Sequence, residues 1–485
     1  MSTQSENSYR TIIRRLSTFG GVQVFNVLIS LLRGKFVAFF LGPEGMGITS
    51  LFTISTTTIQ QFSGLGLGNA IVKESSSAKD NAAQLAAITR VATRLIWLTA
   101  ILGALICAVG APLWSRLAFG DSSQTVSFVV LGGFVALSMA GMGYLNILQG
   151  IGEVKRLSRA SVVGGLSGLC FGVPLYWLYG ADGIVPAMLL LSVCTFAFYF
   201  ISFRRSRVPQ PAVPLERQEA TQLVRRLISL GVVLLAGALA GTLTQYVITI
   251  YIRWAGGETQ VGLFQSANSI TSQYIGMIFS VLALDYFPRL SASSSDRHAL
   301  SMVVGRQIEV GMLTVTPLIM LLMASTPIAI ELLLTGEFHS IKTLVRWLGY
   351  GSFLMTVSYP MGYVFVARGE RRIYLWMECL LLNLTWIICS VGGYMLFGLN
   401  GLGISLVVRT LIDIAVYYSV CHSRYGLSFT PEARREMAVA ATLCTACFAV
   451  SFFSGWWVYV LMALLTVVSL SRSFVLLHNR FRSRH

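Results

Sequence analysis

Long apolar segments recur along the whole chain and are separated by short polar or basic segments. A bilayer core of about 30 Å requires about 20 mostly apolar residues in each spanning helix. Fourteen segments meet this requirement, at 17–41, 46–71, 95–114, 126–149, 158–179, 184–203, 229–252, 261–287, 305–334, 343–367, 373–397, 401–421, 436–454 and 456–477. We therefore predict an all-α polytopic membrane protein with about 14 transmembrane helices.

The composition supports this prediction, because 55% of the 485 residues are hydrophobic and only 12% are charged. A soluble globular chain carries roughly 25% charged residues. The 36 Lys and Arg residues also alternate with the spans. If both termini are cytoplasmic, the predicted outer loops contain only Arg116, Arg253, Lys342 and Arg346. This distribution follows the positive-inside rule, and it assigns the net charge of +16 to contact with membrane lipids and not with nucleic acid.

The sequence contains no GxxxxGK[ST] phosphate loop, no HExxH pair and no CxxC pair. The eight cysteines lie in or beside predicted spans, where they serve as small apolar packing residues. We expect no metal site, no cofactor and no enzymatic activity.

A proline-rich segment with six arginines interrupts the apolar pattern at 204–226. We predict an N-lobe of helices 1–6 over 1–203, a basic cytoplasmic linker over 204–226, a C-lobe of helices 7–12 over 227–425, and helices 13–14 with a cytoplasmic tail over 426–485.

The two predicted lobes resemble each other in sequence. Three glycines of the first lobe pair with glycines of the second at offsets of 214, 217 and 218, namely Gly42 with Gly256, Gly152 with Gly369 and Gly183 with Gly401. Because each lobe has an even number of spans, the two copies enter the membrane the same way round. The sequence therefore predicts a parallel repeat around a central cavity.

Polar side chains recur at helical spacing inside four apolar spans, which places them on one face of each helix. The candidates for substrate binding are Gln23, Asn26, Ser30, Arg33, Thr53, Thr56, Gln60, Gln245, Thr249, Gln265 and Asn268. One polar stripe is explained by packing between helices, but stripes at repeat-related positions favour the lining of a cavity.

Arg33 lies about 12 Å inside the outer end of its helix. A guanidinium at this depth either extends to the outer headgroups or faces a cavity. In a cavity its planar donors suit a lipid-linked phosphate or pyrophosphate.

Four further polar residues lie in predicted helices 11 and 12. Arg409 and Asp413 are one turn apart and can pair, whereas Glu378 and Asn383 are candidates for binding a coupling proton or sodium ion. Burial of Glu378 at a helix interface is the alternative.

The segments LLRGKFVAFFLGPEGMGITSLF (31–52), GLGLGNAIVKES (64–75) and VGLFQSANSITSQYIGMIFSVLALDYFPRLS (261–291) resemble the polysaccharide transporters of the multidrug/oligosaccharidyl-lipid/polysaccharide exporter superfamily, the Wzx-type O-antigen flippases. The resemblance implies two six-helix lobes forming a V and an undecaprenyl-pyrophosphate-linked oligosaccharide as cargo. Arg33 stands where the related lipid II flippases have a cavity arginine. Two other features of the lipid II flippases are not matched. Their arginine in the second helix falls near Gln60 or Gln61 of this sequence, and Ile48 stands in place of their acidic residue early in that helix.

We therefore expect a flippase that translocates an undecaprenyl-pyrophosphate-linked repeat unit across a bacterial cytoplasmic membrane by alternating access. A polysaccharide polymerase and glycosyltransferases are its expected partners. The alternatives are a lipid II flippase and a drug/cation antiporter of the same fold. A lipid-modifying enzyme is disfavoured because no predicted outer loop is long.

Overall fold

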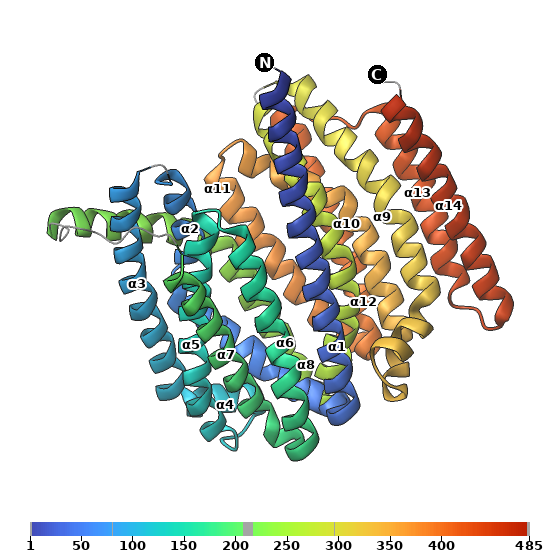
Figure 1. Ribbon diagram of the computed structural model, residues 1–485. Helices are drawn as coiled ribbons and strands as arrows, with labels where there is room; N and C mark the ends of the chain where they lie inside the picture. Colours follow the sequence, from blue (N-terminus) through green and yellow to red (C-terminus); the bar gives the residue numbers. More distant parts are fainter. Residues whose placement is uncertain (1, 80, 207–216, 295, 483–485) are drawn as a thin grey trace. The chain divides into compact units, whose positions relative to one another are not determined.

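The computed structural model describes residues 2–79, 81–206, 217–294 and 296–482, and α-helices make up nearly all of them (Figure 1). No β-strand occurs among these residues. The α-helices are α1 (Ser2–Gly64), α2 (Leu67–Ser77), α3 (Ala82–Val109), α4 (Ala111–Phe119), α5 (Thr125–Gly150), α6 (Val154–Tyr179), α7 (Ile184–Arg204), α8 (Arg217–Ala292), α9 (Arg297–Leu333), α10 (Lys342–Ala367), α11 (Arg371–Tyr374), α12 (Leu382–Tyr425), α13 (Pro431–Val450) and α14 (Trp456–Arg482). Short 3-10 turns η1 (Gly180–Gly183) and η2 (Gly336–Ile341) and a π-helical turn η3 (Leu375–Leu381) connect some of them.

In the described part of the chain, eight helical segments are long and apolar enough to cross a membrane. These segments are Val27–Gly64, Ala82–Val109, Thr125–Gly150, Arg156–Arg204, Leu235–Ser280, Arg297–Leu333, Arg372–Tyr425 and Trp456–Leu476. The chain is an all-α, multi-pass membrane protein.

Four of the eight segments each contain two of the predicted spans. In α1, α8 and α12 the two spans meet at a glycine kink, at Gly42 (φ 63°), Gly257 (φ 78°) and Gly398 (φ 59°). Glycine permits these positive φ angles at little steric cost. In the fourth segment, η1 joins α6 to α7. Helices α10 and α13 coincide with two further predicted spans, although neither belongs to the eight segments.

Glycines in the two halves of the chain share unusual backbone conformations. Gly42 has φ 63° and ψ −167°, and Gly257 has φ 78° and ψ −179°. The glycine that matches Gly42 is therefore Gly257, one residue after the predicted Gly256. Gly180 (φ 55°, ψ −130°) and Gly398 (φ 59°, ψ −140°) also share a backbone conformation. A Cβ on Gly183 would meet the Leu175 carbonyl oxygen at 2.3 Å. Likewise, a Cβ on Gly401 would lie 1.8 Å from the Gly393 carbonyl oxygen. These matches support the predicted repeat.

The turns after α5 and α10 repeat the same hydrogen bonds. At the first, the Glu153 amide donates to the Leu148 carbonyl and the Gly152 amide to the Gln149 carbonyl, both at 3.1 Å. At the second, the amides of Glu370 and Gly369 donate to the carbonyls of Phe365 and Val366, also at 3.1 Å. Gly152 (φ 76°) and Gly369 (φ 69°) occupy the left-handed position of this Schellman turn.

The helix predicted over 46–71 is interrupted, which corrects the prediction at its inner end. Leu65 (φ 49°) and Gly66 (φ 65°) are both left-handed, and α2 begins at Leu67. A Cβ on Gly66 would lie 2.1 Å from the Gly231 carbonyl oxygen of α8. This backbone contact and the positive φ angle both favour glycine at position 66.

The chain divides into two compact units, Met1–Val261 and Gly262–His485. In the first unit α5 packs on α3 and α7, and α6 packs on α1 and α7. Small residues permit close packing of α6 on α7, since a Cβ on Gly164 would lie 2.9 Å from Thr195 and one on Gly168 would lie 3.1 Å from Leu191. Leu227 at the start of α8 joins the buried core around Tyr144.

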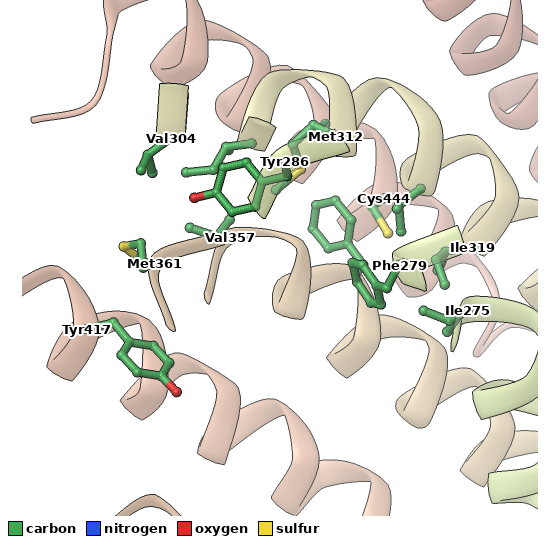
Figure 2. Packing of buried hydrophobic residues seen from close by; sticks show 14 of the residues in the cluster. Ile275, Phe279, Tyr286, Val304, Met312, Ile319, Val357, Met361, Tyr417 and Cys444 are labelled. Carbon is green, nitrogen blue, oxygen red and sulfur yellow. The ribbon is translucent and has the colours of Figure 1, made fainter. Parts of the chain in front are cut away.

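In the second unit α9 contacts α10, α13 and α14, and α10 also contacts α12. Figure 2 shows the buried cluster that these helices form around Tyr286 and Phe279. Tyr286 is fully buried, and its hydroxyl donates a hydrogen bond of 2.7 Å to the Pro360 carbonyl. The polar end of this aromatic side chain is thereby satisfied inside the core.

Candidate functional site

Arg33 and Ser30 lie on the exposed surface of α1, one helical turn apart. A Cβ on Gly168 of α6 would lie 3.9 Å from an Nη atom of Arg33, so the guanidinium reaches α6 at a glycine. No ion pair involves Arg33 among the residues whose side chains the structure describes. Gln23 and Asn26, predicted for the same face, lie outside the described side chains.

The predicted stripe of the second half of α1 is only partly accessible. The Thr53 hydroxyl is exposed and donates to the Thr49 carbonyl at 2.7 Å. Thr56 is 1% exposed and donates to the Phe52 carbonyl at 2.8 Å. Both hydroxyl protons therefore bond to the helix backbone, and Thr56 faces packed protein instead of open space.

Gln60, further along the same helix, lines a cavity of about 320 Å³ in the first unit. Thr57, Gln61 and Gly64 also line it and lie on the same side of α1, because residues three, four and seven apart share a helix face. Met139, Met142, Gly143 and Asn146 of α5 line the cavity at the same spacing. The structure thus places one predicted residue, Gln60, opposite a stripe of α5 that the sequence analysis did not identify, and Asn146 is the polar member of that stripe.

The predicted residues of α8 differ in burial. Thr249 is 2% exposed and donates to the Gln245 carbonyl at 2.8 Å, while Gln245 is half-buried. Gln265 and Asn268 are half-buried in the second unit. Thr249 is thus a packed residue, whereas the other three residues are partly exposed.

The second unit brings together residues of η3 and α12. The Tyr417 hydroxyl donates a hydrogen bond of 2.5 Å to the Glu378 carboxylate, and the Asn383 side-chain amide donates to the Glu378 carbonyl at 2.6 Å. A Cβ on Gly362 of α10 would lie 2.9 Å from the same carboxylate. A glycine therefore provides the space for this pair. Glu378 and Asn383 are adjacent, as their sequence positions predict.

Arg409 and Asp413 form the predicted ion pair, with 3.3 Å between Nε and Oδ2. Their side chains are 18% and 8% exposed. The Arg409 guanidinium also lies over the Trp386 ring, 4.3 Å from its centroid, a favourable cation–π geometry. The arginine is held by a carboxylate on one side and an aromatic face on the other.

Tyr417 and Trp386 are the two residues of this cluster that the sequence analysis missed. Tyr417 carried a recognisable signal, since it lies four residues after Asp413 and eight after Arg409 on one face of α12. Trp386 carried none.

The chain as a whole is similar to known proteins. A curated relative, the lipid III flippase of Escherichia coli (strain K12), is 23% identical over 356 residues, which cover 72% of this chain and 83% of the relative. The lipid III flippase of Shigella flexneri matches equally.

Solved structures share the fold. An inward-facing multidrug resistance MATE family transporter of the MOP superfamily superposes with a TM-score of 0.67 at 17% identity, covering 86% of this chain and 96% of the transporter. The lipid II flippase MurJ in an inward closed conformation has a TM-score of 0.61 at 11% identity, and the match covers 97% of this chain and 99% of MurJ. The family model described as polysaccharide biosynthesis protein matches residues 36–343. This chain is a member of that polysaccharide biosynthesis family, built on the fold of the MOP superfamily of transporters.

Proposed function

We propose that the protein is a flippase that moves an undecaprenyl-pyrophosphate-linked oligosaccharide repeat unit from the cytoplasmic to the outer leaflet of a bacterial cytoplasmic membrane. The family's link to polysaccharide biosynthesis and the similarity to the lipid III flippases support this function. Membership of a transporter family also agrees with the lack of catalytic motifs in the sequence. Polysaccharide polymerase and glycosyltransferases are the partners that this role requires.

Arg33, an exposed arginine within an apolar helix, is the observation that carries the proposal. An arginine in an apolar helix is costly unless water, a counter-charge or an anionic ligand meets it. Its side chain is accessible and reaches α6 at Gly168. A pyrophosphate supplies the counter-charge, and the planar guanidinium can bind two of its oxygens at once.

The transport cycle that we propose is alternating access by two six-helix lobes within fourteen membrane crossings. The residues of the first unit that we assign to the head group are Arg33, Ser30 and the half-buried Gln60 and Gln245, and those of the second unit are the half-buried Gln265 and Asn268. The prenyl tail stays in lipid. This path avoids exposing unpaired polar groups to hydrocarbon, which costs several kcal/mol for each group.

Glu378 is the proposed site of a coupling proton or sodium ion. Its carboxylate lies in a π-helical turn, a distortion that is frequent at functional sites. The Tyr417 hydroxyl and the Asn383 amide hold this turn in place, and the Arg409–Asp413 pair lies on the same helix as Tyr417.

A lipid II flippase is the second candidate, because Arg33 suits its pyrophosphate equally well and the fold matches MurJ. A drug/cation antiporter is less well supported. A cationic substrate would be repelled by an exposed arginine without a described counter-ion.

The test replaces Arg33 in cells that lack the native gene and carry each variant at matched protein level. Arg33→Ala should reduce surface polysaccharide at least tenfold, since the phosphate loses its partner. Arg33→Lys should retain part of the activity, because it keeps the charge but not the two-donor geometry. Lys35→Ala, a half-buried neighbour on another face, is the matched control and should have a milder effect than either. Normal production with Arg33→Ala would remove the phosphate-binding role from the mechanism.

A further inference from the structure

The cavity beside Gln60 is built from two helical stripes that face each other. Thr57, Gln60, Gln61 and Gly64 come from α1, and Met139, Met142, Gly143 and Asn146 come from α5. The left-handed break at Leu65 and Gly66 ends α1 at the edge of the cavity, and the first residues of α2 line it as well. The end of α1, the break and the start of α2 therefore all border the same cavity.

Every described residue that lines this cavity is uncharged. Six of them have an amide or hydroxyl side chain, and these are Thr57, Gln60, Gln61, Asn69, Thr99 and Asn146. Leucine, isoleucine and methionine side chains line the remainder, and four glycines expose backbone. The lining is thus amphipathic, with several hydrogen-bond donors and acceptors but no ionic group.

This lining excludes two kinds of occupant. An acyl chain would leave the amides without partners, at a cost of about 1–3 kcal/mol for each buried group. An ionised group such as a phosphate or carboxylate would lack a counter-charge in a partly desolvated site. An uncharged sugar has neither defect, because its hydroxyls can bond with the amides and its C–H faces can pack on Met139 and Met142. The volume of about 320 Å³ lies at the lower end of the range of about 300–1,000 Å³ for small-molecule pockets.

We propose that this cavity is a specificity subsite for one uncharged sugar residue of the transported head group. The inference rests on the proposed flippase function and adds to it the chemical class of the sugar. Arg33 binds the phosphate that all cargoes share, whereas the amide-lined cavity distinguishes neutral from acidic sugars.

Asn146 and Gly64 are the positions that best test this subsite. A Cβ on Gly68 would lie 2.6 Å from Nδ2 of Asn146, so the amide is set against the first turn of α2. A Cβ on Gly64 would meet only the Met139 methyl group, at 3.7 Å. Gly64 lies in regular helix, and Ala is accommodated there without strain while reducing the cavity.

The experiment measures binding to the purified full-length protein in nanodiscs. Three probes are compared, which are undecaprenyl pyrophosphate alone, the same lipid carrying one glucose, and the same lipid carrying one glucuronic acid. The two sugars differ only in the carboxylate at C6. The variants are Gln61→Met and Asn146→Leu, which replace an amide with an apolar group of similar size, and Gly64→Ala. Gly392→Ala, in a helix with open space around it, is the matched glycine control.

The wild-type protein should bind the glucosyl lipid about tenfold more tightly than the sugarless lipid, equivalent to about 1.4 kcal/mol. The glucuronosyl lipid should show no such gain. Each of the three variants should reduce the advantage of glucose below about threefold and leave binding of the sugarless lipid unchanged. Gly392→Ala should behave as wild type.

Two results would overturn the subsite. Either the wild type binds both sugar probes equally, or all three variants retain the full advantage of glucose. In both cases binding of the sugarless lipid would persist, and the flippase function would stand. If the wild type binds none of the three lipids, the flippase proposal fails and the subsite fails with it.

Discussion

Glu378 shows how a carboxylate is accommodated within an apolar helical segment. The phenol of Tyr417 donates to it over 2.5 Å, and the side chain of Asn383 satisfies the backbone carbonyl of the same residue. Both the carboxylate and the backbone carbonyl of Glu378 therefore have a hydrogen-bond donor, as buried polar groups require.

Replacement of this carboxylate should separate coupling from folding. Glu378→Gln keeps the hydrogen-bonding shape but cannot ionise, so transport should lose most of its dependence on a proton or sodium gradient. The measurement is the translocation of the lipid-linked cargo between the two leaflets of proteoliposomes, with and without each gradient. Glu331→Gln, an exposed carboxylate in α9, is the control and should retain full dependence. Unchanged gradient dependence in Glu378→Gln would make Glu378 a structural residue.

The polar residues of α12 show what sequence spacing can predict. The interval of four residues between Arg409 and Asp413 predicted an ion pair, and the structure contains it. The contact between Tyr417 and Glu378 joins residues 39 positions apart, and it depends on how η3 packs against α12, which spacing within one helix does not encode. For the same reason the sequence predicted Gln60 but not its neighbour Asn146 on α5.

At the scale of helices, the sequence predicted the positions of the spans but not the local irregularities within them. The positions of the apolar spans follow from composition, and the structure has helices at all of them. The break at Leu65 was not predicted, and it coincides with a close approach of Gly231 from α8, which the local sequence does not encode. The π-helical turn at Leu375–Leu381 also has no sequence signature here, since its extra residue is fixed by packing.

The kink in α8 gives a test at this scale. Gly257 has φ 78° and ψ −179°, a region almost restricted to glycine. Gly257→Ala should therefore destabilise the protein by about 1–3 kcal/mol, visible as a lower midpoint of thermal unfolding in detergent. Gly241→Ala in the same helix also meets no atom within 4 Å but has no positive φ. It should be neutral or slightly stabilising. Equal midpoints for the two variants would show that the kink tolerates a side chain.

At the scale of the whole molecule, membrane insertion and family were predictable because they depend on composition and on motifs distributed over much of the chain. The lobe boundaries at 203 and 227 and the count of fourteen crossings stay predictions. Neither composition nor periodicity encodes which helices pack into one compact unit. Leu227, for example, joins the core of the first unit, although its sequence position follows the linker.

Orientation in the membrane is the prediction that concerns the entire chain. It is tested in intact cells by labelling single cysteines in a background without the eight native ones. Cysteines at Glu44, Asp182 and Asn400 should react with an impermeant reagent, because the charge alternation places them outside. Cysteines at Arg156, Arg217 and Arg371 should react only after the cells are permeabilised. The reverse pattern would invert the topology and the direction of transport.

The paired turns at Gly152 and Gly369 also bear on ancestry. Their backbone hydrogen bonds coincide at one offset, yet the neighbouring side chains differ, with Gln149 opposite Val366 and Ile151 opposite Arg368. Mutation replaces exposed side chains freely, but a glycine at positive φ resists replacement. This is the pattern left when a half-length gene is duplicated and the two copies are joined end to end. The ancestor would have been a half-length chain with one such turn, and the side chains around the two copies of the turn would have diverged after fusion.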